Sequence, residues 1–215
     1  MVNLGNVLIF GDSYSTFVGH IPEGYKAFYG DGKPEFDVLD VEQTWWKQVL
    51  NQTQSNLVLN CSYSGTAFSH FGRDNQDYKD RSFITRLEEM INNGFFEKNK
   101  IDTFIVFGGT NDAWNGEEMG EIKQSDWTEE ELYQFHPACC KFFDMVTKRL
   151  PQMRVFAIVN CNIPRVDKGL PAICDLYGID YVTLHDIHKI NGHPDALGMQ
   201  QVSAQVLDFI EKNYA

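Results

Sequence analysis

Short runs of apolar residues, rich in β-branched and aromatic side chains, alternate along this chain with longer amphipathic segments. Near-continuous hydrophobicity over a short run is typical of strands that are buried on both faces of a parallel sheet. Five such runs predict five strands, over residues 7–10, 57–59, 104–107, 155–159 and 181–184.

The clearest helical periodicity lies between the third and fourth predicted strands. Apolar residues recur there at three- and four-residue steps from Leu132 to Leu150, which marks one face of a helix. Thr128 and Glu131 match a capping box, in which two side chains satisfy backbone N–H groups at a helix start. We therefore expect the capping box to begin this helix.

Two other helices are predicted, one around residues 44–53 and one over the apolar positions from Leu197 to Ile210. Trp45 and Trp46 stand side by side at the start of the first of these. Adjacent residues of a helix face different directions. We therefore expect one indole to be packed and the other to be partly exposed.

The alternation of strands and helices has no internal repeat and no linker rich in Pro, Gly or Ser. This pattern predicts one α/β domain over residues 1–215, with helices on both faces of a parallel sheet. Right-handed crossovers place the carboxyl ends of such strands at one edge of the sheet, where ligands bind. We expect the strand order 2-1-3-4-5.

One long segment, residues 14–42, does not fit this repeat. It contains glycines and several aromatic residues: Phe17, Tyr25, Phe28, Tyr29 and Phe36. A long insertion directly after the first strand is often functional, so the segment could wall a substrate pocket. A packed surface loop whose aromatic rings cover the sheet edge is an equal alternative. An interaction surface, for instance between copies of the chain, is a third.

The charge of the chain bears on its partners. Thirty acidic residues against 18 Lys and Arg give a formal net charge of −12. A field of that sign repels nucleic acid and anionic membrane surfaces, so we expect no nucleic-acid partner and a neutral or cationic ligand. An acidity that mainly aids solubility is an equally good interpretation. No apolar run has the length needed to cross a bilayer, so no membrane insertion is expected either.

The five cysteines form no CxxC pair, and their odd number indicates reduced, mostly buried thiols. The N-terminus shows no basic region followed by an apolar run and a small-residue cleavage site. We therefore expect a cytoplasmic protein. A secreted protein whose signal has been removed would have the same sequence pattern.

The first chemical motif, Gly11-Asp12-Ser13, directly follows the first predicted strand. Its glycine permits a tight turn and a close approach of substrate to the main chain. A serine at this place can direct its hydroxyl into the crevice as a nucleophile and offer its own N–H to an oxyanion. On its own, such a motif is more often a cap made by Ser13 or Asp12.

Two further motifs follow the second and third predicted strands. Gly65 can bring its N–H within reach of a substrate oxygen, and Asn111, after two glycines, supplies a neutral amide donor. Such donors can form an oxyanion hole. Taken singly, Gly65 would be a turn glycine, and Asn111 would shape its loop as an Asx-turn. We expect the neighbouring Asp112 to be structural.

The last motif, Gly192-His193-Pro194, precedes the final helix. The unperturbed pKa of histidine lies near neutrality, so His193 can take the proton of Ser13 and return it to a leaving group. Alone, it would be interpreted as a surface histidine near a helix start.

The four stretches together resemble the SGNH (GDSL-type) hydrolase family, whose motif order of serine, glycine, asparagine and histidine is kept by Ser13, Gly65, Asn111 and His193. The resemblance spans nearly the whole chain and implies a flavodoxin-like three-layer α/β/α sandwich with a five-stranded parallel sheet, no cofactor and no metal. It implies that Ser13 attacks an acyl carbonyl, that Ser13, Gly65 and Asn111 receive the oxyanion, and that His193 acts as base and then as acid. Such enzymes include esterases, lipases, thioesterases and sugar deacetylases.

The chain departs from the family pattern three residues before the histidine. Family members commonly have an aspartate there that orients the imidazole, whereas this chain has Ile190. We expect a Ser13–His193 dyad in which Asn191 or a main-chain carbonyl orients the ring. Asp186, seven residues before the histidine, is a candidate only if its loop folds back.

The expected function is hydrolysis of a small-molecule carboxylic ester. The chain shows no apolar lid or amphipathic lipid-binding segment, so a short acyl group, such as acetyl on a sugar or another small alcohol, is favoured over a lipid or a thioester. A non-catalytic ligand-binding module on the same fold is the alternative from another class, because Ile190 removes one support for catalysis. His185 and His188 would share a face if they were helical, but a third ligand for a metal would have to come from elsewhere, so a structural role is the stronger interpretation.

Overall fold

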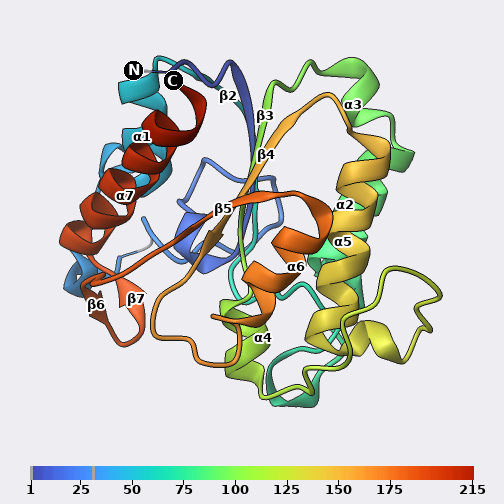
Figure 1. The fold of residues 1–215 in the computed structure, drawn as a ribbon. Helices are drawn as coiled ribbons and strands as arrows, with labels where there is room; N and C mark the ends of the chain where they lie inside the picture. Colours follow the sequence, from blue (N-terminus) through green and yellow to red (C-terminus); the bar gives the residue numbers. More distant parts are fainter. Residues whose placement is uncertain (1, 31) are drawn as a thin grey trace.

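The computed structural model describes residues 2–30 and 32–215. It contains one parallel sheet in the order β2-β1-β3-β4-β5, which confirms the expected strand order. The strands are β1 (Asn6–Gly11), β2 (Asn56–Ser62), β3 (Thr103–Phe107), β4 (Arg154–Val159) and β5 (Asp180–Thr183). Because all five are parallel, their carboxyl ends lie at the lower edge of the sheet in Figure 1.

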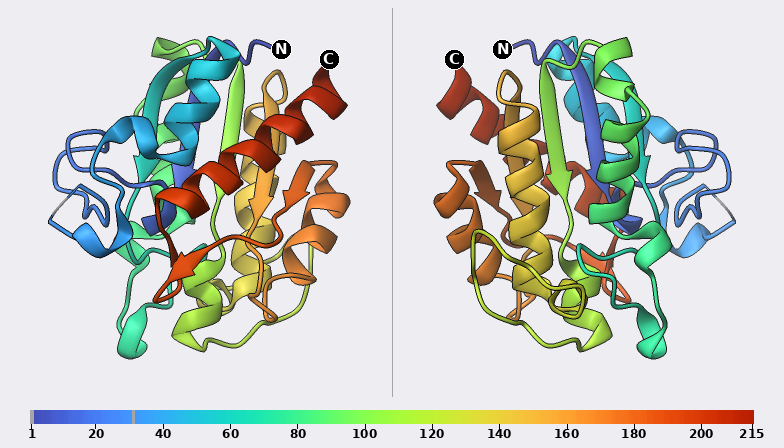
Figure 2. Two further views of the ribbon diagram at one scale, coloured as in Figure 1. Left: turned by 90° about the vertical axis from the view of Figure 1, so that its left-hand side faces the viewer. Right: turned by 90° about the vertical axis from the view of Figure 1, so that its right-hand side faces the viewer.

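Helices cover both faces of the sheet, so the fold is the three-layer α/β/α sandwich expected from the resemblance. Helices α1 and α7 pack together on one face, and α2, α5 and α6 lie on the other (Figures 1 and 2). The helices are α1 (Trp45–Thr53), α2 (Phe83–Asn92), α3 (Phe95–Lys98), α4 (Thr110–Asn115), α5 (Phe135–Arg149), α6 (Gly169–Tyr177) and α7 (Ala196–Tyr214).

Alternation along the strands divides the core into two parts. In β1, Leu8 and Phe10 point into the cluster under α2, α5 and α6, whereas Val7 and Ile9 point into the cluster under α1 and α7. Successive strand residues face opposite sides, so a strand covered by helices on both sides must be apolar throughout. This requirement is why the apolar runs located the strands.

The predicted start of α5 was wrong by six residues, because the N-cap is Gln134 and not Thr128. Thr128 and Glu131 do form the reciprocal hydrogen bonds of a capping box, at 2.7 and 3.3 Å. They stabilise a turn that leads into a short 3-10 segment (Glu131–Tyr133), and α5 begins only at Phe135. The capping pattern is satisfied within one turn, so it does not decide whether the helix continues.

The expectation for the two tryptophans was also wrong, because both indoles are buried. Trp45 packs against Phe107 of the sheet, with 5.7 Å between ring centroids, and its Nε1 donates to Ser15 Oγ at 3.2 Å. Trp46 lies in the same core cluster as Phe17, Tyr29 and Phe36, and the His20 ring lies 6.1 Å from it. The insertion therefore extends the core beyond the helix layer.

Residues 14–42 contribute to both packing and the site. Phe17, Tyr29 and Phe36 are buried in the same cluster as α1 and α7, which agrees with the packed-loop interpretation. Phe28 instead lines the cleft described below, which agrees with the pocket-wall interpretation. The segment bulges from one side of the sandwich in Figure 2.

All five cysteines are buried and unpaired. Within residues 2–30 and 32–215, no helix is long and apolar enough to cross a membrane. His185 and His188 do not lie on a helix; they pair separately with Asp186 at 3.2 Å and Asp195 at 2.8 Å. No cluster of three or more potential metal ligands occurs in the described part of the chain.

Candidate active site

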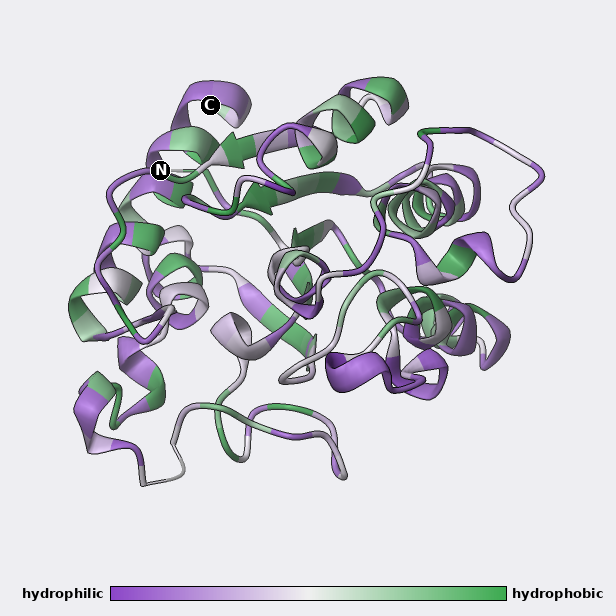
Figure 3. Ribbon diagram, turned by 90° about the horizontal axis from the view of Figure 1, so that it is seen from below, coloured by the Kyte–Doolittle hydropathy of each residue, from purple (hydrophilic) through white to green (hydrophobic). Residues whose placement is uncertain are grey.

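The candidate site lies at the carboxyl edge of the sheet, which Figure 3 views from below. Ser13 follows β1 in a 3-10 turn (Ser13–Ser15), capped by the buried Asp12, whose Oδ1 accepts the N–H of Tyr14 at 3.0 Å. Gly11 has no room for a side chain, because a Cβ there would lie 2.6 Å from Ser62 Oγ. Ser13 is 3% exposed, and its Oγ lies 3.0 Å from His193 Nε2.

His193 is carried by a small hairpin of β6 (Lys189–Ile190) and β7 (His193–Pro194). Its two-residue loop, Asn191-Gly192, has φ values of 49° and 82°. Positive φ at both positions is typical of a type I′ turn, for which Asn-Gly is the preferred sequence. The Asn-Gly pair was therefore a hairpin signal that the sequence analysis did not use.

Two tyrosines hold the loop that carries His193. The Tyr14 hydroxyl donates to the Gly192 carbonyl, and the Tyr29 hydroxyl donates to the Pro194 carbonyl at 2.7 Å. These carbonyls flank the histidine on both sides, so its backbone is tied to the segment that follows β1. Sequence analysis could not find these contacts, because they join residues about 165 and 178 positions apart.

The His193 imidazole is half-buried among aromatic rings. Phe28 stacks on it with 3.7 Å between centroids and an interplanar angle of 6°, and Tyr14 and Trp114 lie at 5.3 and 5.6 Å. Burial lowers the pKa of His193 from 6.5 to about 4, and nearby Lys33 and Lys189 act in the same direction. The imidazole is therefore neutral at pH 7, as a general base must be.

The structure does not bring Asp186 to His193. The Asp186 carboxylate is exposed and pairs with His185. The Nδ1 atom of His193 instead lies 3.4 Å from the main-chain carbonyl oxygen of Asn191. The Asn191 carbonyl therefore takes the place of Asp186 as the candidate group that orients the imidazole. The two-residue turn of the hairpin reverses the chain, so the His193 ring points to the turn that precedes it.

Gly65 and Asn111 lie beside Ser13 in the same cleft. Gly65 has a φ of 86°, which favours glycine, and no atom would contact a Cβ there. Asn111 lies on α4, and its Nδ2 donates to the Thr66 carbonyl at 2.9 Å. An amide nitrogen carries two hydrogens, so this contact fixes the Asn111 side chain while one N–H remains to donate. Neither the Ser13 N–H nor the Gly65 N–H donates a hydrogen bond to a protein group in the described part of the chain.

Asp112 has the structural role expected of it. It is fully buried, and its carboxylate accepts the N–H groups of Phe68 at 3.0 Å and Ser69 at 3.1 Å, just after the Gly65 loop. Ser69 Oγ also donates to the buried Glu117 at 2.8 Å. Burial and the neighbouring Asp112 raise the pKa of Glu117 to about 11, so Glu117 is protonated at neutral pH and the site avoids two adjacent buried anions.

The buried Arg86, on α2, joins the strand ends to the Gly65 loop. Its guanidinium donates to the carbonyls of Gly11 and Cys61 and, at 3.1 Å, to Thr66 Oγ1. It also lies against the rings of Phe10 and Phe83. Nothing in the sequence marked this arginine, because it lies within an ordinary amphipathic helix.

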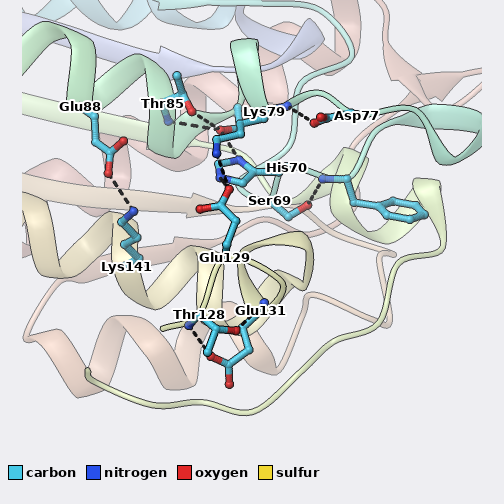
Figure 4. A network of polar contacts seen from close by, with 12 residues as sticks. Ser69, His70, Asp77, Lys79, Thr85, Glu88, Thr128, Glu129, Glu131 and Lys141 are labelled. Carbon is cyan, nitrogen blue, oxygen red and sulfur yellow. Dashed lines mark hydrogen bonds and ion pairs between the residues drawn. The ribbon is translucent and has the colours of Figure 1, made fainter. Parts of the chain in front are cut away.

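The chain after Gly65 is fixed to the other helices by a second polar network, drawn in Figure 4. His70 Nδ1 lies 3.0 Å from Ser82 Oγ at the start of α2, while Glu129 pairs with Lys79. Lys141 of α5 pairs with Glu88 of α2 at 2.8 Å. These contacts join the segment after the Gly65 loop to the start of α2, and α2 to α5 of the same layer.

The assembled residues line a cleft of about 550 Å³. Ser13, His193, Gly65 and Asn111 all contribute to its wall, although they come from four separate parts of the sequence. A nucleophile that contacts a neutral base, next to an amide donor and a glycine loop, suits acyl transfer.

Comparisons with known proteins agree with this geometry. The model of the GDSL-like lipase/acylhydrolase family matches residues 5–210. The chain belongs to this family. It is therefore a GDSL-type esterase or acylhydrolase. No curated protein sequence matches the chain.

Two similar solved structures come from Bacteroides and carry the description GDSL-like lipase. The B. uniformis ATCC 8492 protein is 40% identical, with 97% of this chain and 96% of that chain covered and a TM-score of 0.90. The B. ovatus ATCC 8483 protein is 36% identical, with 98% and 100% covered and a TM-score of 0.90. A carbohydrate acetylesterase from Sinorhizobium meliloti, at 15% identity and a TM-score of 0.59, shares the fold, with 98% and 100% covered.

The low pKa of His193 predicts an unusually acid-tolerant enzyme. The base works in its neutral form, so kcat/KM should fall on acidification with an inflection near pH 4. At pH 5.5 more than about nine-tenths of the activity should remain, whereas a histidine of ordinary pKa would leave about one-tenth. The measurement is kcat/KM for an acetyl ester between pH 3.5 and 8. At the acid end, the protein is returned to neutral pH to check that its activity recovers in full.

Asp12 provides the control for this profile, because burial raises its pKa to about 7. An Asp12→Asn variant should lack any inflection near pH 7 that Asp12 causes and should keep the inflection near pH 4. An inflection near 6.5 in both proteins would contradict the prediction.

Proposed function

We propose that this enzyme hydrolyses carboxylic esters with a short acyl group, such as acetyl on a sugar or another small alcohol, through an acyl-Ser13 intermediate. The observation that carries the proposal is the 3.0 Å contact between Ser13 Oγ and His193 Nε2 inside the cleft. A neutral imidazole at that distance can accept the hydroxyl proton as the oxygen attacks.

In the proposed reaction, Ser13 Oγ bonds to the acyl carbon while its proton moves to His193 Nε2. The carbonyl oxygen becomes an oxyanion and receives hydrogen bonds from the N–H groups of Ser13 and Gly65 and from the Asn111 amide. Collapse breaks the bond to the alkoxide, which takes the proton from His193. Water, activated by the same imidazole, then releases the carboxylate and restores Ser13.

The developing imidazolium has unusual support. In place of a carboxylate, His193 has the Asn191 carbonyl at Nδ1 and the face of Phe28 stacked on its ring. A carbonyl and an aromatic face both favour a cation, but more weakly than a carboxylate does. We therefore infer slower proton transfer than an aspartate-supported histidine would give.

The lining of the cleft supports a short acyl group. Among its described lining residues, the apolar side chains are aromatic, and none is aliphatic. A long acyl chain would find no aliphatic channel.

Trp114, 46% exposed at the cleft, offers a flat face for a sugar ring. The same fold occurs in an acetyl xylan esterase from Butyrivibrio proteoclasticus, so the fold is compatible with a substrate of this kind.

The test combines a covalent probe with an ester series. A fluorophosphonate should label Ser13, located by mass spectrometry, and kcat/KM should fall from 4-nitrophenyl acetate to the octanoate. A rise toward octanoate would overturn the short-chain assignment in favour of a lipase. Folded protein that neither reacts with the probe nor hydrolyses any ester would instead indicate a non-catalytic binding module.

A further inference from the structure

The charge of the cleft is opposite to that of the chain. Its wall contains Lys26, Lys33, Arg73 and Arg81, and no Asp or Glu occurs among its described lining residues. The whole chain has 30 acidic residues against 18 Lys and Arg. The expectation of a neutral or cationic ligand came from this net charge, which does not describe the cleft.

Lys33 lies close to the reacting groups. Its Nζ is 3.5 Å from the centroid of the Phe28 ring, and the His193 imidazole stacks 3.7 Å from the same centroid. Two groups this close to one ring must occupy its opposite faces. The Lys33 ammonium is therefore about 7 Å from the imidazole that protonates the leaving alcohol.

Lys26 also lines the cleft, and its main chain is bonded to the Gly65 loop. Its main-chain carbonyl accepts the N–H of Ser64, the neighbour of Gly65, at 2.9 Å. The Lys26 side chain is exposed and lines the cleft, and no described carboxylate forms an ion pair with it. The cleft wall thus carries one ammonium over the Phe28 ring that stacks on His193 and a second lysine on the segment bonded to the Gly65 loop.

The two arginines of the cleft pair with acidic neighbours, Arg81 with Asp80 and Arg73 with Asp74. Arg81 makes two hydrogen bonds with Asp80, and its guanidinium lies 4.7 Å from the Tyr78 ring. Arg73 contacts Asp74 only at 3.8 Å, and both side chains are 82% exposed. Exposed pairs of this kind contribute little energy, so a substrate anion can compete for the guanidinium groups. We expect the lysines to carry most of the selectivity, because Lys33 lies over the ring that stacks on the catalytic imidazole.

We propose that the cleft selects esters that carry a negative charge, a carboxylate, sulfate or phosphate, on either the alcohol or the acyl group. The inference rests on the proposed ester hydrolysis and names its substrate class. A cleft lined by one sign of charge raises the local concentration of oppositely charged substrate. Together the two lysines should contribute a preference of about tenfold at low salt.

The experiment compares matched esters that differ only in charge. For the alcohol side, the acetate ester of 3-hydroxybenzoate is compared with that of 3-hydroxybenzamide. For the acyl side, 4-nitrophenyl monoglutarate is compared with 4-nitrophenyl valerate, after subtraction of spontaneous hydrolysis. We expect kcat/KM to be at least about tenfold higher for the anionic ester of one pair, and the responding pair identifies the charged side of the substrate.

Two lysine variants and salt test the origin of the preference. The double variant Lys26→Gln/Lys33→Gln should lower the anionic-to-neutral ratio of kcat/KM by about fivefold or more, and so should 0.5 M NaCl. Lys98→Gln, an exposed lysine of α3 outside the cleft, should leave the ratio unchanged. A ratio that the double variant does not lower overturns the assignment to these lysines.

The failure of this inference is distinguishable from the failure of the proposed function. Ser13-dependent hydrolysis of the neutral esters, with ratios at or below one in both pairs, overturns the anionic substrate class and leaves the esterase proposal standing. Folded protein that hydrolyses neither member of any pair overturns both.

Discussion

Ser13→Ala should lower kcat for acetyl-ester hydrolysis by about 10⁴- to 10⁶-fold, and His193→Ala should lower it by a similar factor. The two side chains form one unit, because the hydroxyl attacks only as the imidazole 3.0 Å away takes its proton. Loss of either partner removes the whole nucleophilic route. The double variant should therefore be about as slow as either single variant, a non-additive result.

The measurement is steady-state kcat on 4-nitrophenyl acetate, with thermal unfolding to show that each variant is folded. Ser203→Ala is a matched control, because Ser203 is a buried serine on α7, outside the cleft, whose hydroxyl has no partner among the described residues. The control should retain wild-type kcat. A Ser13→Ala protein that keeps more than a tenth of wild-type kcat would show that another group performs the hydrolysis.

Asn111→Ala should lower kcat by about 10²- to 10³-fold while changing KM little. The amide is expected to bind the oxyanion, which exists only in and near the transition state, so its loss acts on kcat rather than on ground-state binding. The contact with the Thr66 carbonyl holds the amide in place before substrate arrives. Asn111→Asp should be at least as slow, because a carboxylate repels the oxyanion.

Asn213→Ala is the matched control for this prediction. Its Nδ2 also donates to a main-chain carbonyl, that of Phe209 at 2.8 Å, but near the exposed end of α7. It should behave as wild type. A decrease of less than threefold in kcat for Asn111→Ala would remove Asn111 from the oxyanion site and leave the two backbone N–H groups as the donors.

The prediction of the strands succeeded because it depended on a local pattern. A strand between two helix layers must be apolar on both faces, as Leu8 and Ile9 illustrate by pointing into opposite core clusters. The start of α5 failed for the opposite reason. The capping hydrogen bonds of Thr128 and Glu131 are local and present, but the continuation of the helix depends on packing that the motif does not contain.

The site shows the same division. Ser13, Gly65, Asn111 and His193 could be selected from sequence, because each follows a turn at the end of a strand or before a helix and has a side chain or backbone suited to one step of acyl transfer. The groups that position them were not selected. Arg86 was one of these, because its role depends on which carbonyls the fold brings to one buried guanidinium.

By itself, the sequence located the strands and selected four candidate residues, because these follow from short-range patterns of hydrophobicity and turn chemistry. The strand order and the three layers were expected from the α/β alternation and the family resemblance. Only the tertiary structure decided what orients His193, which tyrosines hold its loop and what charge lines the cleft. Those properties depend on distances between residues far apart in the chain. Composition averages over that arrangement, so a chain with a net charge of −12 can still present a cationic cleft to its substrate.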